Sequence, residues 1–243
     1  MIKRNYYKIV RVFPDPSSYF YIKNETMNNS QIMFRGEWLP TVNLEYSFDK
    51  VNWKSYNGNL YIPANGYLYL RNTSGTLGTS EYDSIFYLYG NFSIGGDIRT
   101  LFNYTDVESV TKIPDYGLSF PFVCFNDCKC IDISNLSFRG ITEIGNYGLQ
   151  NTFSTNSTFT KGVDLRDVTT LGEGALNNLY SSNFNLKEAY APNVSTWDTN
   201  KTDSWLNSVA PTGVVYKPST LTIPTNTDSG IPYGWTTQDY PVK

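Results

Sequence analysis

The sequence of 243 residues contains no histidine and has little charge. The missing histidine excludes Ser–His and Cys–His catalytic arrangements, histidine acid–base chemistry and histidine metal ligands. Charged residues make up 17% of the chain, against roughly 25% in an average soluble domain. Nineteen basic and 22 acidic residues give a net charge of −3. Because non-specific nucleic-acid binding needs a basic surface, we expect no nucleic-acid partner.

Long apolar runs are also missing. No segment approaches the roughly 18 apolar residues of a membrane helix, so no membrane insertion is expected. The first 13 residues are basic but lack the apolar run of about 7–15 residues and the cleavage site of a secretory signal. We therefore expect a protein with the composition of a displayed surface protein but without an export signal. A virus, which leaves its host by lysis, needs no such signal.

Cysteine is scarce, and its three copies lie within seven residues, at Cys124, Cys128 and Cys130. An odd number of cysteines without an export signal argues against a disulfide framework. A thiolate zinc site would need a fourth ligand, which histidine cannot supply here. Packing of buried thiols is the simpler interpretation, and the sequence leaves open whether the cluster has a role. We expect neither a metal nor a cofactor.

Aromatic residues are abundant, at 16% of the chain, and they help to define a β-rich segment over residues 18–100. Apolar residues alternate with polar ones at Val42, Leu44, Tyr46 and Phe48, which is typical of a half-buried strand. Asn57–Gly58 and Asn65–Gly66 predict hairpin turns, because both residue types accept positive φ. Short strands at this spacing predict an antiparallel β-sandwich or small barrel. Further strands are expected to begin at Leu60, Tyr67 and Ile85.

Residues 1–17 form a separate segment that ends at two prolines, Pro14 and Pro16. Since proline holds the preceding residue extended, we expect this segment to stand apart as an arm. The alternative is a first strand of the adjoining domain. We interpret the segment as a docking arm whose basic and aromatic side chains are Lys3, Arg4, Tyr6, Tyr7, Lys8, Arg11 and Phe13.

From residue 101 the chain repeats itself. IPDYGLSFPF at 113–122 returns as IGNYGLQNTF at 144–153 and as LGEGALNNLY at 171–180, at offsets of 31 and 27 residues. A second element recurs in phase with it, as IDISNL at 131–136, VDLRDV at 163–168 and AYAPNV at 189–194. A strand followed by a helix-like turn at this period predicts a short leucine-rich-repeat solenoid over residues 101–204. Residues 205–243, with Trp205 and Trp235, are the expected C-terminal cap and tail.

These motifs resemble the BspA-like leucine-rich-repeat surface proteins of gut bacteria and their phages. The resemblance spans about residues 20–236 and implies a β domain, stacked repeats and a role in adhesion or display. It supplies no catalytic residues. The repeats here are few and divergent, and residues 1–17 have no counterpart. The matching stretches are TVNLEYSFD at 41–49 with Trp53, ANG at 64–66, YLR at 69–71, FNDC at 125–128, DISNL at 132–136, WLNSV at 205–209, TGVVYKP at 212–218 and GIPYGW at 230–235.

Five residues are candidates for a binding site. Asp132 and Asp164 share a repeat position, so stacked strands would place both carboxylates on one face, as a calcium site or a glycosidase pair requires. The simpler interpretation is that they solvate the outer side of short strands. Tyr116 and Tyr147 also share a position and predict either an exposed ladder or packing between repeats. Tyr190 joins them as a candidate, because tyrosine suits both protein contacts and sugar stacking.

Together these features predict a mainly β, non-enzymatic protein of a phage virion, either a capsid-decorating head fibre or a tail-associated protein. Its expected partners are other virion proteins, further copies of itself, and a host surface glycan or protein. The alternative is an adhesin or glycan-binding protein on the bacterial cell surface. A glycan-degrading enzyme would instead require two carboxylates roughly 5–10 Å apart in a cleft.

Overall fold

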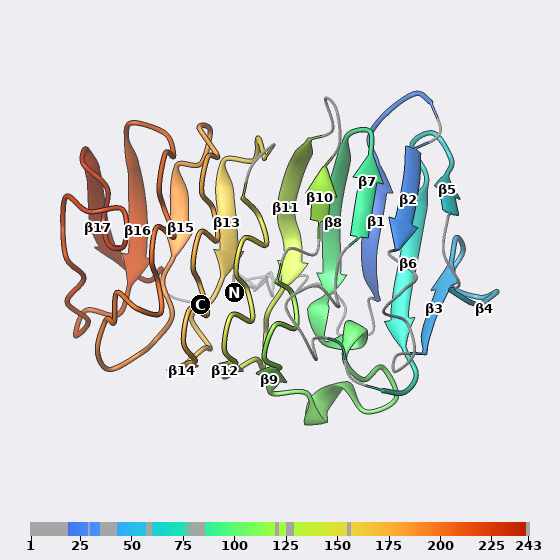
Figure 1. The fold of residues 1–243 in the computed structure, drawn as a ribbon, viewed down its shortest axis with the longest axis horizontal. Helices are drawn as coiled ribbons and strands as arrows, with labels where there is room; N and C mark the ends of the chain where they lie inside the picture. Colours follow the sequence, from blue (N-terminus) through green and yellow to red (C-terminus); the bar gives the residue numbers. More distant parts are fainter. Residues whose placement is uncertain are drawn as a thin grey trace, which may run out of the picture.

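A computed structural model shows a mainly β chain (Figure 1). It describes residues 19–28, 30–34, 43–56, 60–75, 77, 86–119, 122–124, 129–154 and 157–241. Within these residues the only helical segments are two short 3-10 helices, η2 (Ile98–Leu101) and η3 (Val107–Ser109). The predicted arm and its seven candidate side chains lie outside the described residues, as does Cys128. Cys130 is buried at the start of a strand.

The first sheet has six strands in the order β11-β8-β1-β6-β3-β4. Its inner face buries alternate residues such as Phe20, Ile22 and Leu68, while Tyr21 and Lys23 point to the outer face. All pairs are antiparallel except β8 with β11, which is parallel. The strands are β1 (Phe20–Asn24), β3 (Leu44–Ser47), β4 (Lys54–Ser55), β6 (Tyr67–Asn72), β8 (Phe92–Asp97) and β11 (Cys130–Ser137).

A second sheet has four strands in the order β10-β7-β2-β5. Its buried residues Ile62 and Leu88 belong to the same hydrophobic cluster as Phe20 and Leu68 of the first sheet. The predicted antiparallel pairing within residues 18–100 is confirmed for the described strands, and the two parallel pairs are made by strands that follow residue 100. The strands are β2 (Ser30–Phe34), β5 (Leu60–Ile62), β7 (Phe86–Tyr89) and β10 (Phe122–Cys124).

The turn at Asn65–Gly66 does not form a hairpin, so that prediction is wrong. Asn65 does adopt positive φ, at 54°, and the Gly66 N–H donates to the Pro63 carbonyl at 2.8 Å. However, β5 pairs with β2 in the second sheet, whereas β6 pairs with β1 and β3 in the first. The Asn24 amide donates to the Ile62 and Pro63 carbonyls, which fastens this crossing between sheets. Asn57–Gly58 lies outside the described residues.

Beyond residue 100 the strands run parallel and follow the repeat. Ile113, Ile144 and Leu171, the first residues of the three copies, pair in register through β9 (Lys112–Ile113), β12 (Glu143–Ile144) and β14 (Thr170–Leu171). A fourth sheet contains β13 (Lys161–Asp164), β15 (Glu188–Tyr190), β16 (Gly213–Lys217) and β17 (Trp235–Asp239). Its pairing continues across the predicted boundary between residues 204 and 205. Figure 1 shows β11, β13, β15, β16 and β17 side by side along the molecule.

The connection between these strands is a series of β-turns, so the predicted helix-like turn is wrong. Tyr147 and Asn151 have φ of 54° and 53°, and the Gly148 N–H donates to the Gly145 carbonyl three residues back. The Leu149 N–H instead donates to the Ala175 carbonyl of the next coil at 2.9 Å. A helix would satisfy its N–H groups internally. In these turns alternate N–H groups donate to carbonyls of the next coil, and these bonds connect successive coils.

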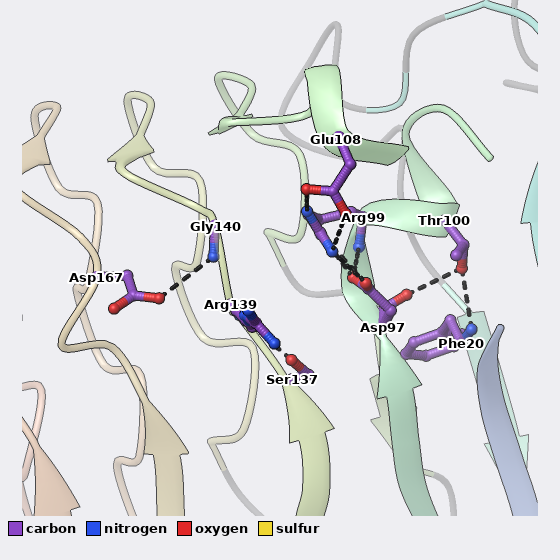
Figure 2. A network of polar contacts seen from close by, with 9 residues as sticks. All are labelled: Phe20, Asp97, Arg99, Thr100, Glu108, Ser137, Arg139, Gly140 and Asp167. Atoms are coloured by element: carbon purple, nitrogen blue, oxygen red, sulfur yellow. Dashed lines mark hydrogen bonds and ion pairs between the residues drawn. The ribbon is translucent and has the colours of Figure 1, made fainter. Parts of the chain in front are cut away.

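A buried ion pair lies at the end of the first sheet, next to the repeats (Figure 2). The Arg99 guanidinium donates to Asp97 at 2.8 Å, and both side chains are about 5% exposed or less. Arg99 also reaches the exposed Glu108 at 3.3 Å. A Cβ at Gly140 would lie 3.0 Å from Arg99, so glycine allows the repeat to approach this side chain. The Gly140 N–H donates to Asp167 of the next coil.

Candidate binding site

The two tyrosines of the turn region form a ladder of stacked rings that is half-buried rather than exposed. The Tyr116 and Tyr147 rings stack with centroids 5.2 Å apart and planes 14° apart, and both side chains are half-buried. The third copy has Gly174 at this position, with φ of 58°. A Cβ there would lie 2.3 Å from the Tyr147 ring, so the missing side chain leaves room for that ring. The ladder therefore packs successive coils together, and a role in binding stays a prediction.

Tyr190 lies on the fourth sheet and is only 4% exposed. Its ring stacks on Tyr216 of the neighbouring strand, with centroids 4.8 Å apart. The Lys161 ammonium lies 5.2 Å from the same ring, and the Arg166 guanidinium lies 5.9 Å from it. Burial raises the pKa of the Tyr190 hydroxyl. The Tyr190 ring is thus buried beneath the Lys161 and Arg166 side chains, which lie between it and solvent.

A depression of about 170 Å³ lies between β11 and β13. β11 and β13 belong to different sheets. Among the described residues, an isolated parallel bridge between Cys130 of β11 and Ser157, which precedes β13, connects the two. The volume is below the roughly 300–1,000 Å³ of typical ligand clefts, so it suits one small polar unit. We call this feature the β11–β13 depression. It is lined by Ile133, Ser134, Leu136, Lys161, Gly162, Val163, Asp164, Arg166 and Tyr190.

The charged groups of the depression are held in ion pairs. Arg166 donates to both oxygens of Asp164, at 2.8 and 2.9 Å through Nε and at 2.6 Å through Nη2. The Arg166 Nη1 group also donates to the Pro241 carbonyl at 3.1 Å. Lys161 lies 4.0 Å from Glu188, and both side chains are about half exposed. The depression is therefore polar and preorganised, with its charges largely balanced.

The two candidate aspartates have different surroundings. Asp164 lines the depression beside Tyr190, with which it pairs in the sheet, so these two candidates are brought together. Asp132 is not among the lining residues. Its Oδ1 accepts from the Ser134 N–H at 2.8 Å, and its charge helps to raise the pKa of Tyr21, mainly a result of burial. Among the described residues no three acidic or cysteine side chains gather as a metal site would require.

Four residues in or beside the β11–β13 depression were not predicted from the sequence: Lys161, Arg166, Tyr216 and Tyr240. The Tyr240 hydroxyl donates to the Ala191 carbonyl, and its ring lies 5.6 Å from the Arg166 guanidinium. Burial raises the pKa of Tyr240 well above its ordinary value. The spacing of Asp164 and Arg166, two residues apart, was a usable signal for the ion pair. Nothing local indicated that Tyr216 would stack on Tyr190 or that Tyr240 would lie beside Arg166.

Comparison with known protein families, curated proteins and solved structures finds no match to this chain. The resemblance to BspA-like proteins therefore remains a prediction. In the part of the chain that the structure describes, no helix is long and apolar enough to cross a membrane.

Proposed function

We propose that this protein is a non-enzymatic display protein of the BspA-like type. In this proposal residues 18–100 form a β-sandwich, residues 101–204 form a leucine-rich solenoid and residues 205–243 complete its end. Two sheets with one shared hydrophobic cluster support the sandwich. Parallel strands in register with the sequence repeat support the solenoid.

The proposed activity is binding of a host surface glycan or protein through the outer side of the parallel strands. The observation that carries this proposal is the β11–β13 depression, where two cations, a carboxylate and a tyrosine floor from the fourth sheet and its flanking turn face Ser134 of the first sheet. Such a site offers hydrogen bonds of fixed geometry at little cost in side-chain entropy. Arg166 donates to both oxygens of Asp164, which favours a role of this carboxylate in binding over acid–base chemistry.

The proposed location is a phage virion, as a head fibre or a tail-associated protein. There the arm of residues 1–17 would dock on other virion proteins, and several copies would give avidity to a weak site. Symmetric self-association is the common arrangement for such appendages.

Quantitative mass spectrometry tests the location. Purified phage particles are compared with the envelope fraction of uninfected host cells, and peptides from both halves of the chain are counted in each. We expect the protein in particles at a fixed ratio to the major capsid protein. Its presence only on uninfected cells would overturn the virion assignment and favour the alternative, a bacterial adhesin. Deleting residues 1–17 should leave the fold intact and abolish incorporation, and normal incorporation of that variant would contradict the docking arm.

A further inference from the structure

A second group of tyrosines lies on the outer face of the first sheet. Tyr67 and Tyr69 on β6 have nearly parallel rings, with centroids 5.8 Å apart and planes 7° apart. Tyr21 on β1 meets them edge-on, at 5.4 and 6.2 Å. A Cβ at Gly95 of β8 would lie 2.3 Å from the Tyr21 hydroxyl oxygen, so only glycine lets this ring lie over the next strand. We call Tyr21, Tyr67 and Tyr69 the Tyr67 platform.

Cations surround the platform. The Lys50 ammonium lies 4.8 Å from the Tyr69 ring, and Lys23 lies 5.9 Å from Tyr67 while pairing with Glu25 at 2.7 Å. Farther along β6, Arg71 donates to Glu45 at 2.7 Å and packs between two more aromatic rings.

Charge on this face is therefore nearly balanced, and the groups left for a ligand are ring surfaces and hydroxyls. Tyr67 is 37% exposed. Carbohydrate has the matching chemistry, since a sugar ring presents an apolar C–H face bordered by hydroxyls. A strongly acidic polymer would find little excess positive charge here.

The platform and the β11–β13 depression are joined through β11. A bulge in this strand leaves both Ser134 and Asn135 exposed. Against the larger raising effect of burial, the Asn135 side chain lowers the pKa of the Tyr21 hydroxyl of the platform, and Ser134 lines the depression. Three strand positions separate β6 from β11 in the first sheet, and at about 4.8 Å a strand the far edge of the platform lies about 15 Å from the edge of the depression. A ligand that contacts both must be an extended chain.

We propose that the Tyr67 platform is a carbohydrate subsite and that the ligand of this face is a neutral glycan chain of several sugar units. This inference rests on the proposed binding function and specifies its ligand. The tyrosine rings stack on sugar faces, and the depression holds a further unit of the same chain through hydrogen bonds.

Affinity electrophoresis of the full chain tests this inference. The gels contain dextran, laminarin, xylan, mannan, acidic polygalacturonate, or surface polysaccharide extracted from the host. The variants are Tyr67→Ser and Tyr69→Ser on the platform and Ser134→Trp, which fills the depression. The matched control is Tyr61→Ser, because Tyr61 is 62% exposed and lies on the second sheet. Thermal melting of each variant verifies that it folds.

We expect a neutral polysaccharide to retard the protein. Each platform variant should weaken the apparent affinity about threefold to tenfold, as loss of one aromatic contact predicts, and the control should bind like the wild type. Affinity should also rise with oligosaccharide length until the chain spans both sites.

Two results would overturn the subsite. In the first, Ser134→Trp abolishes retardation but the platform variants do not change it. This result would show that the platform is not a subsite, and it would leave the proposed binding function standing. In the second, only polygalacturonate retards the protein, or no polysaccharide does. This result would exclude a neutral glycan as the ligand. Binding to host cells that survives periodate oxidation and is lost after protease treatment would then identify a protein receptor, again without contradicting the proposed function.

Discussion

Substitution of Tyr180 by phenylalanine removes one oxygen atom from the centre of the repeat region. Tyr180 is fully buried, and its hydroxyl accepts a hydrogen bond from the Val163 N–H at 3.0 Å. This N–H lies where the pairing of β13 with β15 shifts register between Lys161 and Asp164. A Cβ at Gly162 would lie 2.7 Å from the hydroxyl, so glycine makes room for this bond. The tyrosine therefore satisfies a donor at the irregularity of the strand.

The cost of Tyr180→Phe follows from the donor that remains. Val163 is 2% exposed, so its N–H would be buried without an acceptor, which costs about 1–3 kcal/mol of folding stability. For a chain of this length each kcal/mol lowers Tm by about 2–4 °C, so the total is roughly 2–12 °C. Tyr216→Phe is the matched control, because the Tyr216 hydroxyl makes no hydrogen bond to the described residues and its loss should change stability by less than about 0.5 kcal/mol. Scanning calorimetry measures both variants, and equal Tm values would contradict a stabilising hydrogen bond from the Val163 N–H to the Tyr180 hydroxyl.

Alkaline unfolding gives a second readout of the same residue. Burial raises the pKa of Tyr180 well above the ordinary value for tyrosine, so folding favours its neutral form. The folding stability that the neutral Tyr180 hydroxyl contributes is fully present below the unfolded-chain pKa of about 10. It is lost as pH rises through the folded-state pKa. Tyr180→Phe should therefore lose less stability than the wild type between pH 9 and about pH 11. Equal losses in urea titrations across this range would contradict the assignment.

Three further predictions concern other positions. Gly174→Ala should lower stability by more than the roughly 1–2 kcal/mol of a left-handed residue, because its Cβ would lie 2.3 Å from the Tyr147 ring; a smaller loss in urea unfolding would contradict the ladder packing. Asp97→Asn should cost about 3–5 kcal/mol, because it leaves the Arg99 charge buried,. Glu108→Gln should lower folding stability by less than about 1 kcal/mol, since Glu108 is 80% exposed,. Equal losses of stability for Asp97→Asn and Glu108→Gln in calorimetry would contradict the dependence on burial.

The repeat was predictable from the sequence because it depends on the spacing of apolar residues within short segments. Apolar residues at fixed spacing set the phase that places Ile113, Ile144 and Leu171 in register. The crossing at Asn65–Gly66 was not predictable in the same way. Asparagine and glycine fix the local φ angles of the turn, but the choice of sheet for the next strand depends on contacts distant in the sequence.

The candidate site shows the same division. The stacking of Tyr116 on Tyr147 followed from their shared repeat position. Burial of Tyr190 involves Tyr216, which lies 26 residues later in the chain. The repeat position of Asp164 suggests a carboxylate available to a ligand, whereas Arg166 donates to both of its oxygens. Long-range packing therefore decides which predicted residues are exposed to a ligand.

Binding of the labelled full chain to intact host cells tests whether this protein binds the host surface through the β11–β13 depression. The comparison uses Ser134→Trp, which fills the β11–β13 depression, and Ser219→Trp, which adds the same side chain at an exposed position outside the lining of the depression. We expect saturable binding by the wild type and by Ser219→Trp, and at least a tenfold loss of affinity for a folded Ser134→Trp. Wild-type affinity in Ser134→Trp, or no binding by the wild type, would contradict this expectation.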